Sequence, residues 1–207
     1  ITPVLSEEAK ELTFAALKKA KEHHVKISFD LNYRSKLWTS GVEEKQKMLS
    51  EMMEYVDICF GNARDAAKCL GYSEDSVDFI NGDYSICVDE NHMRNGLNHY
   101  HFSHLITTLR NSISASDNGW SGAVCTSEDY YKGRDYMLHI VDRVGGGDSF
   151  ASGVLHGILS DMGSRKSLEF GLASAAIKHT IPGDLNYINE SEVLAMIESD
   201  GAGRVQR

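Results

Sequence analysis

Hydrophobic and polar residues alternate along this chain with two different periods, and each change of period marks the boundary of an expected helix or strand. Residues 6–24 have a helical period, with Ser6 as the expected N-cap, acidic residues in the first turn and lysines in the last. Residues 25–31 then have the character of a short strand that ends in polar residues. The expected apolar stripe of the first helix consists of Ala9, Leu12, Ala16 and Ala20.

The same alternation continues to the end of the chain. Strands that alternate with helices of roughly 10 to 15 residues are typical of βαβ units, so the pattern predicts an α/β fold with a mostly parallel sheet and helices on both faces. In such sheets, ligands bind at the carboxyl ends of the strands. Further helices are expected at residues 42–55, 62–70, 86–100, 148–159, 165–179 and 190–198. Further strands are expected at residues 56–60, 104–109, 122–126 and 137–141, the last two joined by a polar, tyrosine-rich stretch.

Composition and charge narrow the class of protein. The 207 residues carry 21 Lys and Arg against 30 Asp and Glu, a formal charge of −9, which repels a nucleic-acid backbone. The chain has no run of about 18 apolar residues, and its first residues lack the basic start and apolar stretch of a signal peptide. The four cysteines form no C-x-x-C pair, which argues against zinc and against a disulfide framework. We therefore expect a cytoplasmic protein without nucleic-acid or membrane partners.

The candidate chemistry is concentrated in the sequence D-R-V-G-G-G-D-S-F of residues 142–150, which follows an expected strand and leads into an expected helix. Three consecutive glycines allow backbone N–H groups to turn inward around an anion, and the start of the helix adds positive potential. Asp148 would lie beside this phosphate site, where its carboxylate can accept a proton from an alcohol. Tight packing of a glycine-rich turn is the alternative interpretation, because the sequence is neither a Walker loop nor a dinucleotide-binding fingerprint.

A hydrolase is a second candidate from another class. Gly147-Asp148-Ser149 resembles the Gly-Asp-Ser of one esterase group, in which Ser149 would be the nucleophile. Such enzymes carry a D-x-x-H motif downstream of the serine, whereas Asp89 to His92 lies upstream of it here. The order of the two motifs therefore disfavours the hydrolase hypothesis without excluding it.

Residues 142–150 resemble the signature D-T-x-G-A-G-D of the ribokinase-like, phosphofructokinase-B type sugar kinases. Residues 29–38, F-D-L-N-Y-R-S-K-L-W, resemble the D-x-N-x-R-x-x-L-W of the 2-keto-3-deoxygluconate kinase branch. Residues 61–65 resemble the N-x-x-E of the family with Asp in place of Glu, and residues 178–186 are similar to a late loop that reaches the substrate. These matches cover most of the chain.

The resemblance implies a three-layer, Rossmann-like ribokinase fold and ATP-dependent phosphorylation of a sugar acid, with 2-keto-3-deoxygluconate as the first choice. It implies ATP and Mg²⁺ as cofactors, K⁺ as a candidate monovalent cation, and a homo-oligomer for the full-length protein. The alternatives are a kinase for fructose, ribose or a nucleoside, and a catalytically silent nucleotide-binding fragment.

The resemblance also implies a role for each candidate residue. Arg34 can instead be a solvated loop arginine, Asn62 and Asp65 can be helix-capping residues, and Ala175 can serve helix packing alone. Arg110 departs from the T-x-G pattern of the family. The expected catalytic residues are Asp148 as general base and Gly145, Gly146 and Gly147 as anion hole. The expected substrate-binding residues are Asn32, Arg34 and Asp184. The expected nucleotide-binding residues are Asn62, Asp65, Arg110 and Ala175, and Asp142 is the expected acid of the monovalent cation site.

Family members are longer than this chain, so it is expected to be the carboxy-terminal part of one sugar-kinase domain, without the amino-terminal strands and the lid. Residues 1–80 would be its substrate-side half and residues 81–207 its nucleotide-binding half. Catalysis by this part alone is expected to be weak, because a lid excludes water from the reaction.

Overall fold

The computed structural model describes residues 1–72, 89–114 and 116–199, which form two compact units. Unit 1 comprises Ile1–Thr107 and Cys125–Tyr130, and unit 2 comprises Thr108–Val124 and Tyr131–Arg207. The expected functional boundary between residues 80 and 81 lies outside the described residues, as does the start of the helix expected at 86–100. The division into substrate-side and nucleotide-binding halves stays a prediction.

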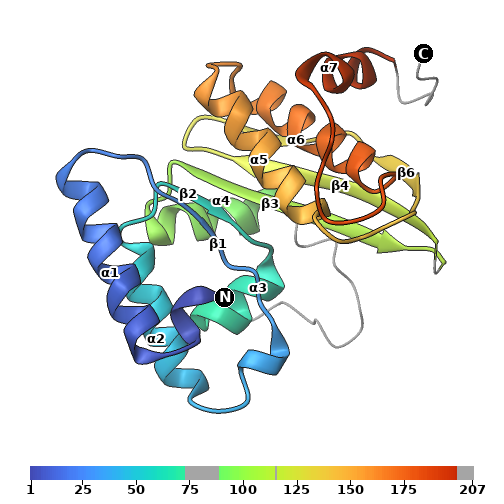
Figure 1. Ribbon diagram of the computed structural model, residues 1–207. Coiled ribbons are helices and arrows are strands. Elements are labelled where there is room, and N and C mark those ends of the chain that lie inside the picture. Colours follow the sequence, from blue (N-terminus) through green and yellow to red (C-terminus); the bar gives the residue numbers. More distant parts are fainter. Residues whose placement is uncertain (73–88, 115, 200–207) are drawn as a thin grey trace. The chain divides into compact units, whose positions relative to one another are not determined.

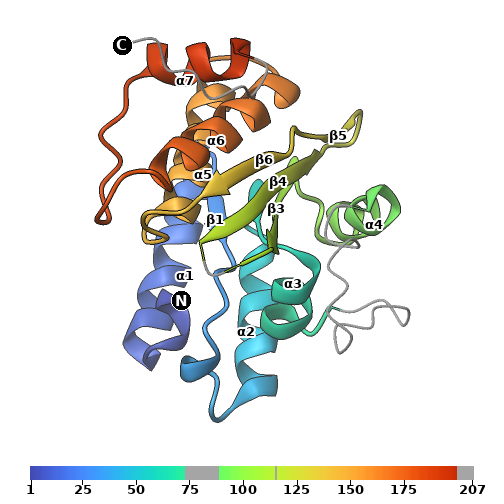
Figure 2. The ribbon, with the colours of Figure 1, turned by 90° about the vertical axis from the view of Figure 1, so that its right-hand side faces the viewer.

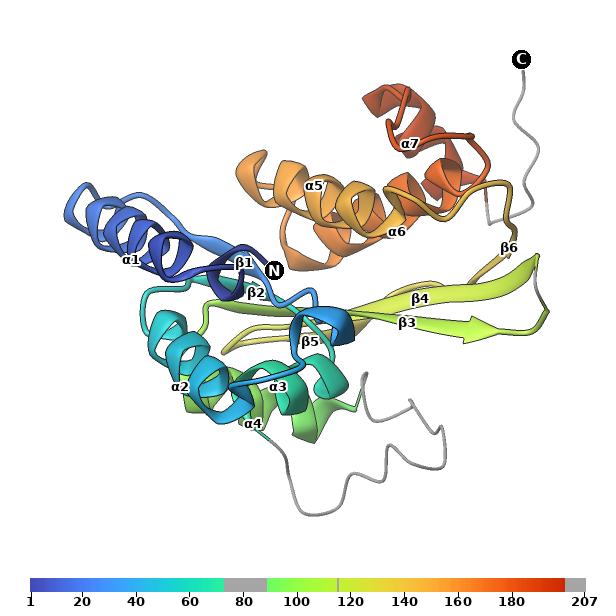
Figure 3. The same cartoon turned by 60° about the horizontal axis from the view of Figure 1, so that its bottom comes forward.

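Unit 1 has helices on both faces of a short parallel sheet. Strand β1 pairs in parallel with β2, with Ser28 opposite Ile58, and β2 pairs in parallel with the start of β3. Helix α1 covers one face, and α2, α3 and α4 cover the other (Figures 2 and 3). The elements of this part are η1 (Thr2–Val4), α1 (Glu7–Glu22), β1 (Ser28–Asp30), η2 (Ser35–Leu37), α2 (Val42–Met53), β2 (Ile58–Phe60), α3 (Ala63–Leu70), α4 (Glu90–Tyr100) and β3 (His104–Ser112).

Unit 2 has an antiparallel arrangement of strands under two long helices. Strand β4 pairs with β6, with Asp117 opposite His139, and α5 and α6 lie side by side on the same face of these strands (Figures 1 and 3). Strands β3 and β4 contribute residues to both units, and the hydrogen-bonded order is β1-β2-β3-β4-β5, with β6 on β4. The remaining elements are β4 (Asp117–Cys125), β5 (Tyr130–Lys132), β6 (Tyr136–His139), α5 (Gly146–Leu159), α6 (Ser164–Lys178) and α7 (Glu190–Glu198).

The helix boundaries follow from capping residues that the sequence displays. The Oγ atom of Ser6 accepts a hydrogen bond from the amide of Ala9 (3.2 Å), and the Oδ1 atom of Asn62 accepts one from the amide of Asp65 (2.9 Å). Gly71 ends α3 in a left-handed conformation with φ 67°. These caps confirm the expected positions of α1 and α3.

The buried face of α1 differs from the expected stripe. Leu12 is 71% exposed, whereas Leu17 is 7% exposed and is the buried residue of this helix. Five positions are about 140° apart around an α-helix, so Leu12 and Leu17 cannot both face the sheet. The choice of Leu12 for the core was therefore wrong.

The strands also differ in length from the expectation. β1 and β2 have three residues each, whereas β3 and β4 have nine each and carry polar residues at the ends that the pattern assigned to loops. β5 lies in the tyrosine-rich stretch that was expected to be a connection. Arg110 consequently lies within β3 and not at the end of a strand. Backbone pairing holds these polar positions in the sheet, a contribution that hydrophobic periodicity does not register.

Glycines bring α5 and α6 into close contact. A Cβ atom on Gly153 would lie 2.9 Å from the Cα atom of Gly171, and one on Gly157 would lie 2.6 Å from the Cα atom of Ser167. Larger residues at these positions would separate the helices. Within the described residues, none of the helices combines the length and the apolarity that crossing a membrane requires.

Candidate active site

The glycines at 145–147 form the turn that opens α5. Gly145 is the N-cap and has φ 77°, a conformation that strongly favours glycine. A Cβ atom on Gly145 would lie 2.2 Å from the backbone carbonyl oxygen of Asp184, so a close approach of backbones also requires glycine here. The turn thus places the expected substrate-side acid, Asp184, directly against the expected anion hole.

The backbone N–H groups of this turn are largely available to a ligand. The amide of Ser149 donates to the carbonyl of Gly145 (2.8 Å), and that of Gly146 makes a long hydrogen bond to the carbonyl of Arg143 (3.4 Å). Within the described residues, the amides of Gly145, Gly147 and Asp148 have no hydrogen-bond acceptor. Unpaired amides at the start of a 14-residue helix provide an anion-binding position.

Asp148 lies in the first turn of α5 with its side chain exposed. Gly147 is exposed as well, whereas Gly146 is buried under the imidazole of His179, whose Cε1 atom would lie 2.6 Å from a Cβ on Gly146. An acid turned toward the solvent beside open amides can meet both an alcohol and a phosphate. Burial of Asp148 would have precluded the expected role.

Two arginines add positive charge to this part of unit 2. The pKa of Arg110 is lowered by burial and, second, by the nearby charge of Arg143. Both arginines also lower the pKa of His179, which packs on Gly146, so the charges lie around the start of α5. Among the described residues the guanidinium of Arg110 has no ion-pair or hydrogen-bond partner. Like charges held close together are typical of a site for a polyanion.

The loop after α6 lies against the glycine turn. Both the Val141 and Asp142 amides donate to the carbonyl of His179 (2.8 and 3.2 Å), and the side-chain amide of Asn186 donates to the Oγ atom of Ser149. Asp142 accepts from the amide of Val144 through Oδ1 (3.0 Å) and from that of Gly183 through Oδ2 (2.8 Å). Both hydrogen bonds lower the pKa of Asp142, and the one from Val144 has the larger effect.

The candidate residues of unit 1 also gather at one edge of its sheet. Asn32 and Arg34 follow β1, Asn62 follows β2, and Asp65 lies in the first turn of α3. Burial raises the pKa of Asp65, and the charges of Arg64 and Arg34 act in the opposite direction, so Arg34 lies near Asp65. Parallel strands bring these residues together because their carboxyl ends meet at the same edge.

Some candidate residues have structural tasks that account for their presence. The carboxamide oxygen of Asn62 is used as a helix cap, and Asn32 has φ 44°, a left-handed conformation that asparagine tolerates better than most residues. Ala175 is fully buried in α6, where its carbonyl accepts from the Nδ1 atom of His179 (2.6 Å). Their expected contacts with substrate and nucleotide stay predictions.

Ser149 is only 6% exposed, and its Oγ atom accepts a hydrogen bond from Asn186. A nucleophile must be accessible and hydrogen-bonded to a base, and an asparagine amide is not a base. The arrangement therefore gives the hydrolase alternative no support.

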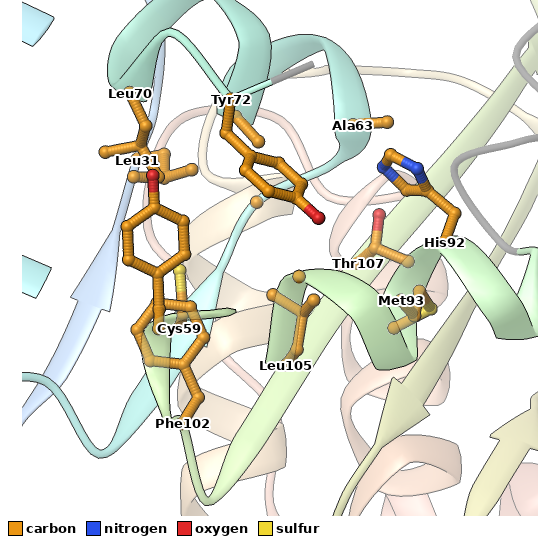
Figure 4. Close-up of a pocket in the computed structure, with 14 residues that line it drawn as sticks. Leu31, Cys59, Ala63, Leu70, Tyr72, His92, Met93, Phe102, Leu105 and Thr107 are labelled. Atoms are coloured by element: carbon orange, nitrogen blue, oxygen red, sulfur yellow. The ribbon is translucent and has the colours of Figure 1, made fainter. Parts of the chain in front are cut away.

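A small cavity in unit 1 is lined in part by chain neighbours of candidate residues, namely Leu31, Gly61 and Ala63. Its volume is about 30 Å³, enough for roughly one water molecule, and its walls come from α3, α4 and strands β2 and β3 (Figure 4). Figure 4 shows His92 and Thr107 on one side of it and Leu31 and Leu70 on the other. It is too small for a sugar or a nucleotide.

Three residues near the glycine turn were missed by sequence reasoning. Arg143 occupies the position of Thr in the motif, and Lys178 and His179 are the first residues of the late loop, yet none of them was assigned a role. The unusual arginine at position 143 of the motif could have indicated a positive charge near the glycine turn. Nothing in the pattern indicates that Lys178 and His179 are buried, because polar residues at the end of a helix are ordinarily exposed.

The buried histidine makes unit 2 sensitive to acid. Burial lowers the pKa of His179, the hydrogen bond to Ala175 opposes this, and the neighbouring positive charges lower the pKa further. Below the ordinary value of 6.5 the unfolded chain therefore binds a proton more readily than the folded chain, and stability is lost as the pH falls.

We expect the thermal midpoint of the wild type to fall between pH 7.5 and 5.5 and that of His179→Gln to fall by less than half as much. His23→Gln, at an exposed histidine, should show the same fall in thermal midpoint between these pH values as the wild type. The thermal midpoints are measured by circular dichroism. If the midpoint of His179→Gln falls with pH as much as that of the wild type, the imidazole of His179 is not buried in its neutral form.

A family profile, a solved structure and a curated relative that are similar to this chain all belong to carbohydrate kinases. The sequence profile described as pfkB family carbohydrate kinase matches residues 1–91 and 118–190. The crystal structure of 2-dehydro-3-deoxygluconokinase from Thermotoga maritima superposes with a TM-score of 0.84 at 38% identity, over 95% of this chain and 57% of that one. The 2-dehydro-3-deoxygalactonokinase of Haloferax volcanii is 28% identical over 98% of this chain and 57% of its own length.

A putative ribokinase from E. coli shares the fold with a TM-score of 0.74 at 17% identity, over 94% of this chain and 56% of its own. This similarity confirms the expected ribokinase-like fold. The chain spans somewhat more than half the length of the relatives that it matches.

Proposed function

Because this chain belongs to the pfkB family of carbohydrate kinases, we propose that it transfers the terminal phosphoryl group of ATP to a hydroxyl group of a sugar acid. The sugar acid that we propose is a 2-keto-3-deoxy acid, with 2-keto-3-deoxygluconate as the first choice. The names of the two kinases described above, which act on a dehydro-deoxygluconate and a dehydro-deoxygalactonate, support this class of substrate.

The observation that carries the proposal is the exposed carboxylate of Asp148 beside unpaired amides at the start of α5. Phosphoryl transfer requires alignment and charge stabilisation more than covalent help from the protein. In our proposal Asp148 accepts the proton of the acceptor hydroxyl. The amides of Gly145 and Gly147, with Arg110 and Arg143 nearby, stabilise negative charge on the phosphoryl group.

Mg²⁺ would neutralise charge on the phosphates of ATP. Among the described residues no group of three or more His, Cys, Asp or Glu could hold a metal ion. This fits Mg²⁺, which binds through one or two carboxylates, waters and the phosphates of its substrate. We propose that Asp65, one methylene shorter than the Glu of the family motif, acts on the metal through water.

Arg34 is the proposed determinant for a sugar acid. Its guanidinium is exposed and, among the residues that the structure describes, makes only a local hydrogen bond to the carbonyl of Tyr33 (3.0 Å), so it is available to a carboxylate. A guanidinium binds a carboxylate through two parallel hydrogen bonds. A kinase for a neutral sugar would not need this charge.

The test is a phosphorylation assay with 2-keto-3-deoxygluconate, fructose and ribose on the full gene product that carries this chain. We expect turnover with the sugar acid. Calorimetric binding of ATP and ADP without turnover on any of the three sugars would favour the silent nucleotide-binding alternative.

Replacement of Arg34 separates the two classes of substrate. We expect Arg34→Ala to lower kcat/KM for the sugar acid by about 100-fold, corresponding to loss of one charge-assisted contact of about 2.7 kcal/mol, and to change kcat/KM for a neutral sugar by less than threefold. Lys36→Ala, at an exposed cation of the same loop, is the control and should change neither. Equal losses on both substrates would favour a neutral sugar.

A further inference from the structure

Lys178 is the largest fully buried side chain among the described residues, with 0% exposure. It is the last residue of α6. Transfer of an ammonium group from water into a protein interior costs several kcal/mol unless other groups compensate the charge. The surroundings of Lys178 should therefore contain negative charge or carbonyl oxygens.

Three features provide that compensation. The Nζ atom of Lys178 donates to the carbonyl oxygen of Ile181 (3.0 Å). The C-terminal end of α6 carries the negative pole of the helix. The carboxylate of Asp142 lies close enough for the charge of Lys178 to contribute to its lowered pKa. The ammonium thus ties the loop after α6 to the end of that helix, and its charge acts on Asp142 in the segment that precedes the glycine turn.

Carbonyl and carboxylate oxygens are also the ligands that a monovalent cation prefers. Here both carboxylate oxygens of Asp142 accept backbone amides, and the carbonyl of Ile181 accepts the lysine. The carbonyl of His179 accepts the amides of Val141 and Asp142. Each of these oxygens already accepts at least one hydrogen bond from the protein, so the monovalent cation that the sequence resemblance implies would compete with these donors for the remaining lone pairs.

We propose that the ammonium group of Lys178 takes the place of a monovalent metal ion, and that it holds the loop of residues 179–184 against the glycine turn. Lys178 is a positioning residue, since Asp184 and His179 from this loop pack on Gly145 and Gly146. The proposal concerns the order of the loop and holds for any substrate. The protein should consequently be indifferent to K⁺.

The test compares the wild type with Lys178→Ala and Lys178→Met in KCl, NH₄Cl and tetramethylammonium chloride at equal concentration. Alanine leaves space for a small cation, whereas methionine fills it with an apolar chain. The readouts are the thermal midpoint and hydrogen exchange of the peptide covering residues 179–186, neither of which requires catalysis.

We expect the wild type to have the same midpoint and the same exchange rate in all three salts. Lys178→Ala should lose roughly 6 °C or more in tetramethylammonium chloride, exchange faster in the loop, and regain most of both in K⁺ or NH₄⁺. Lys178→Met should be destabilised equally in all three salts.

Selective stabilisation of the wild type by K⁺ would overturn the proposal. So would a Lys178→Ala protein that responds to K⁺ and NH₄⁺ no more than Lys178→Met does. If both variants fail to fold, the salt comparison of the wild type alone still decides, because a metal site at Asp142 requires a K⁺ response.

Discussion

Asp148→Asn is expected to lower kcat for phosphoryl transfer by two to four orders of magnitude, roughly the contribution of a general base. Asparagine keeps the size of the side chain and removes the ability to accept a proton. Because Asp148 is exposed in the first turn of α5, the substitution should leave the fold intact. Loss of a negative charge beside the open amides should leave ATP affinity unchanged or slightly higher. Steady-state kinetics and calorimetry with ATP measure the two effects.

Asp135→Asn is the matched control, because Asp135 is an exposed aspartate of the same unit outside the glycine turn. It should retain wild-type kcat and nucleotide affinity. A kcat for Asp148→Asn within threefold of the wild type would remove Asp148 from the role of base. A parallel fall in ATP affinity would indicate instead that the carboxylate organises nucleotide binding.

Gly145→Ala is expected to destabilise the protein and to abolish nucleotide binding. Alanine at φ 77° is strained, and its Cβ would lie 2.2 Å from the carbonyl oxygen of Asp184, so the late loop must move away from the turn. Strain of this kind costs about 1–3 kcal/mol before the clash is counted. We expect a thermal midpoint lower by at least 4 °C, since about 1 kcal/mol shifts a chain of this size by roughly 2–4 °C.

Gly147→Ala provides an internal comparison within the same motif. A Cβ atom at Gly147 would meet no atom within 4 Å, and Gly147 is the second residue of a helix, where alanine is favourable. Its midpoint should equal that of the wild type or exceed it. Equal destabilisation by the two substitutions would contradict the close contact between Gly145 and the late loop.

The sequence by itself determined the helices and the position of the glycine turn. Capping residues such as Ser6, Asn62 and Gly71 act through local hydrogen bonds and local backbone angles, so their effect is visible without knowledge of distant segments. The motif of residues 142–150 likewise combines a turn, a helix start and an acid within a few positions. Interactions between residues close in the sequence are therefore sufficient to determine where a helix begins and ends.

Only the tertiary structure decided which of two equally apolar positions is buried and which polar residue is enclosed. Leu12 and Leu17 are the same residue type on one helix, and the sheet beneath α1 selects Leu17. Lys178 looks like an ordinary helix-terminal lysine, yet it is fully buried and donates a hydrogen bond to the carbonyl of Ile181. Burial is a property of all segments that surround a residue, and its free energy depends on partners far away in the chain, so a local pattern cannot determine it.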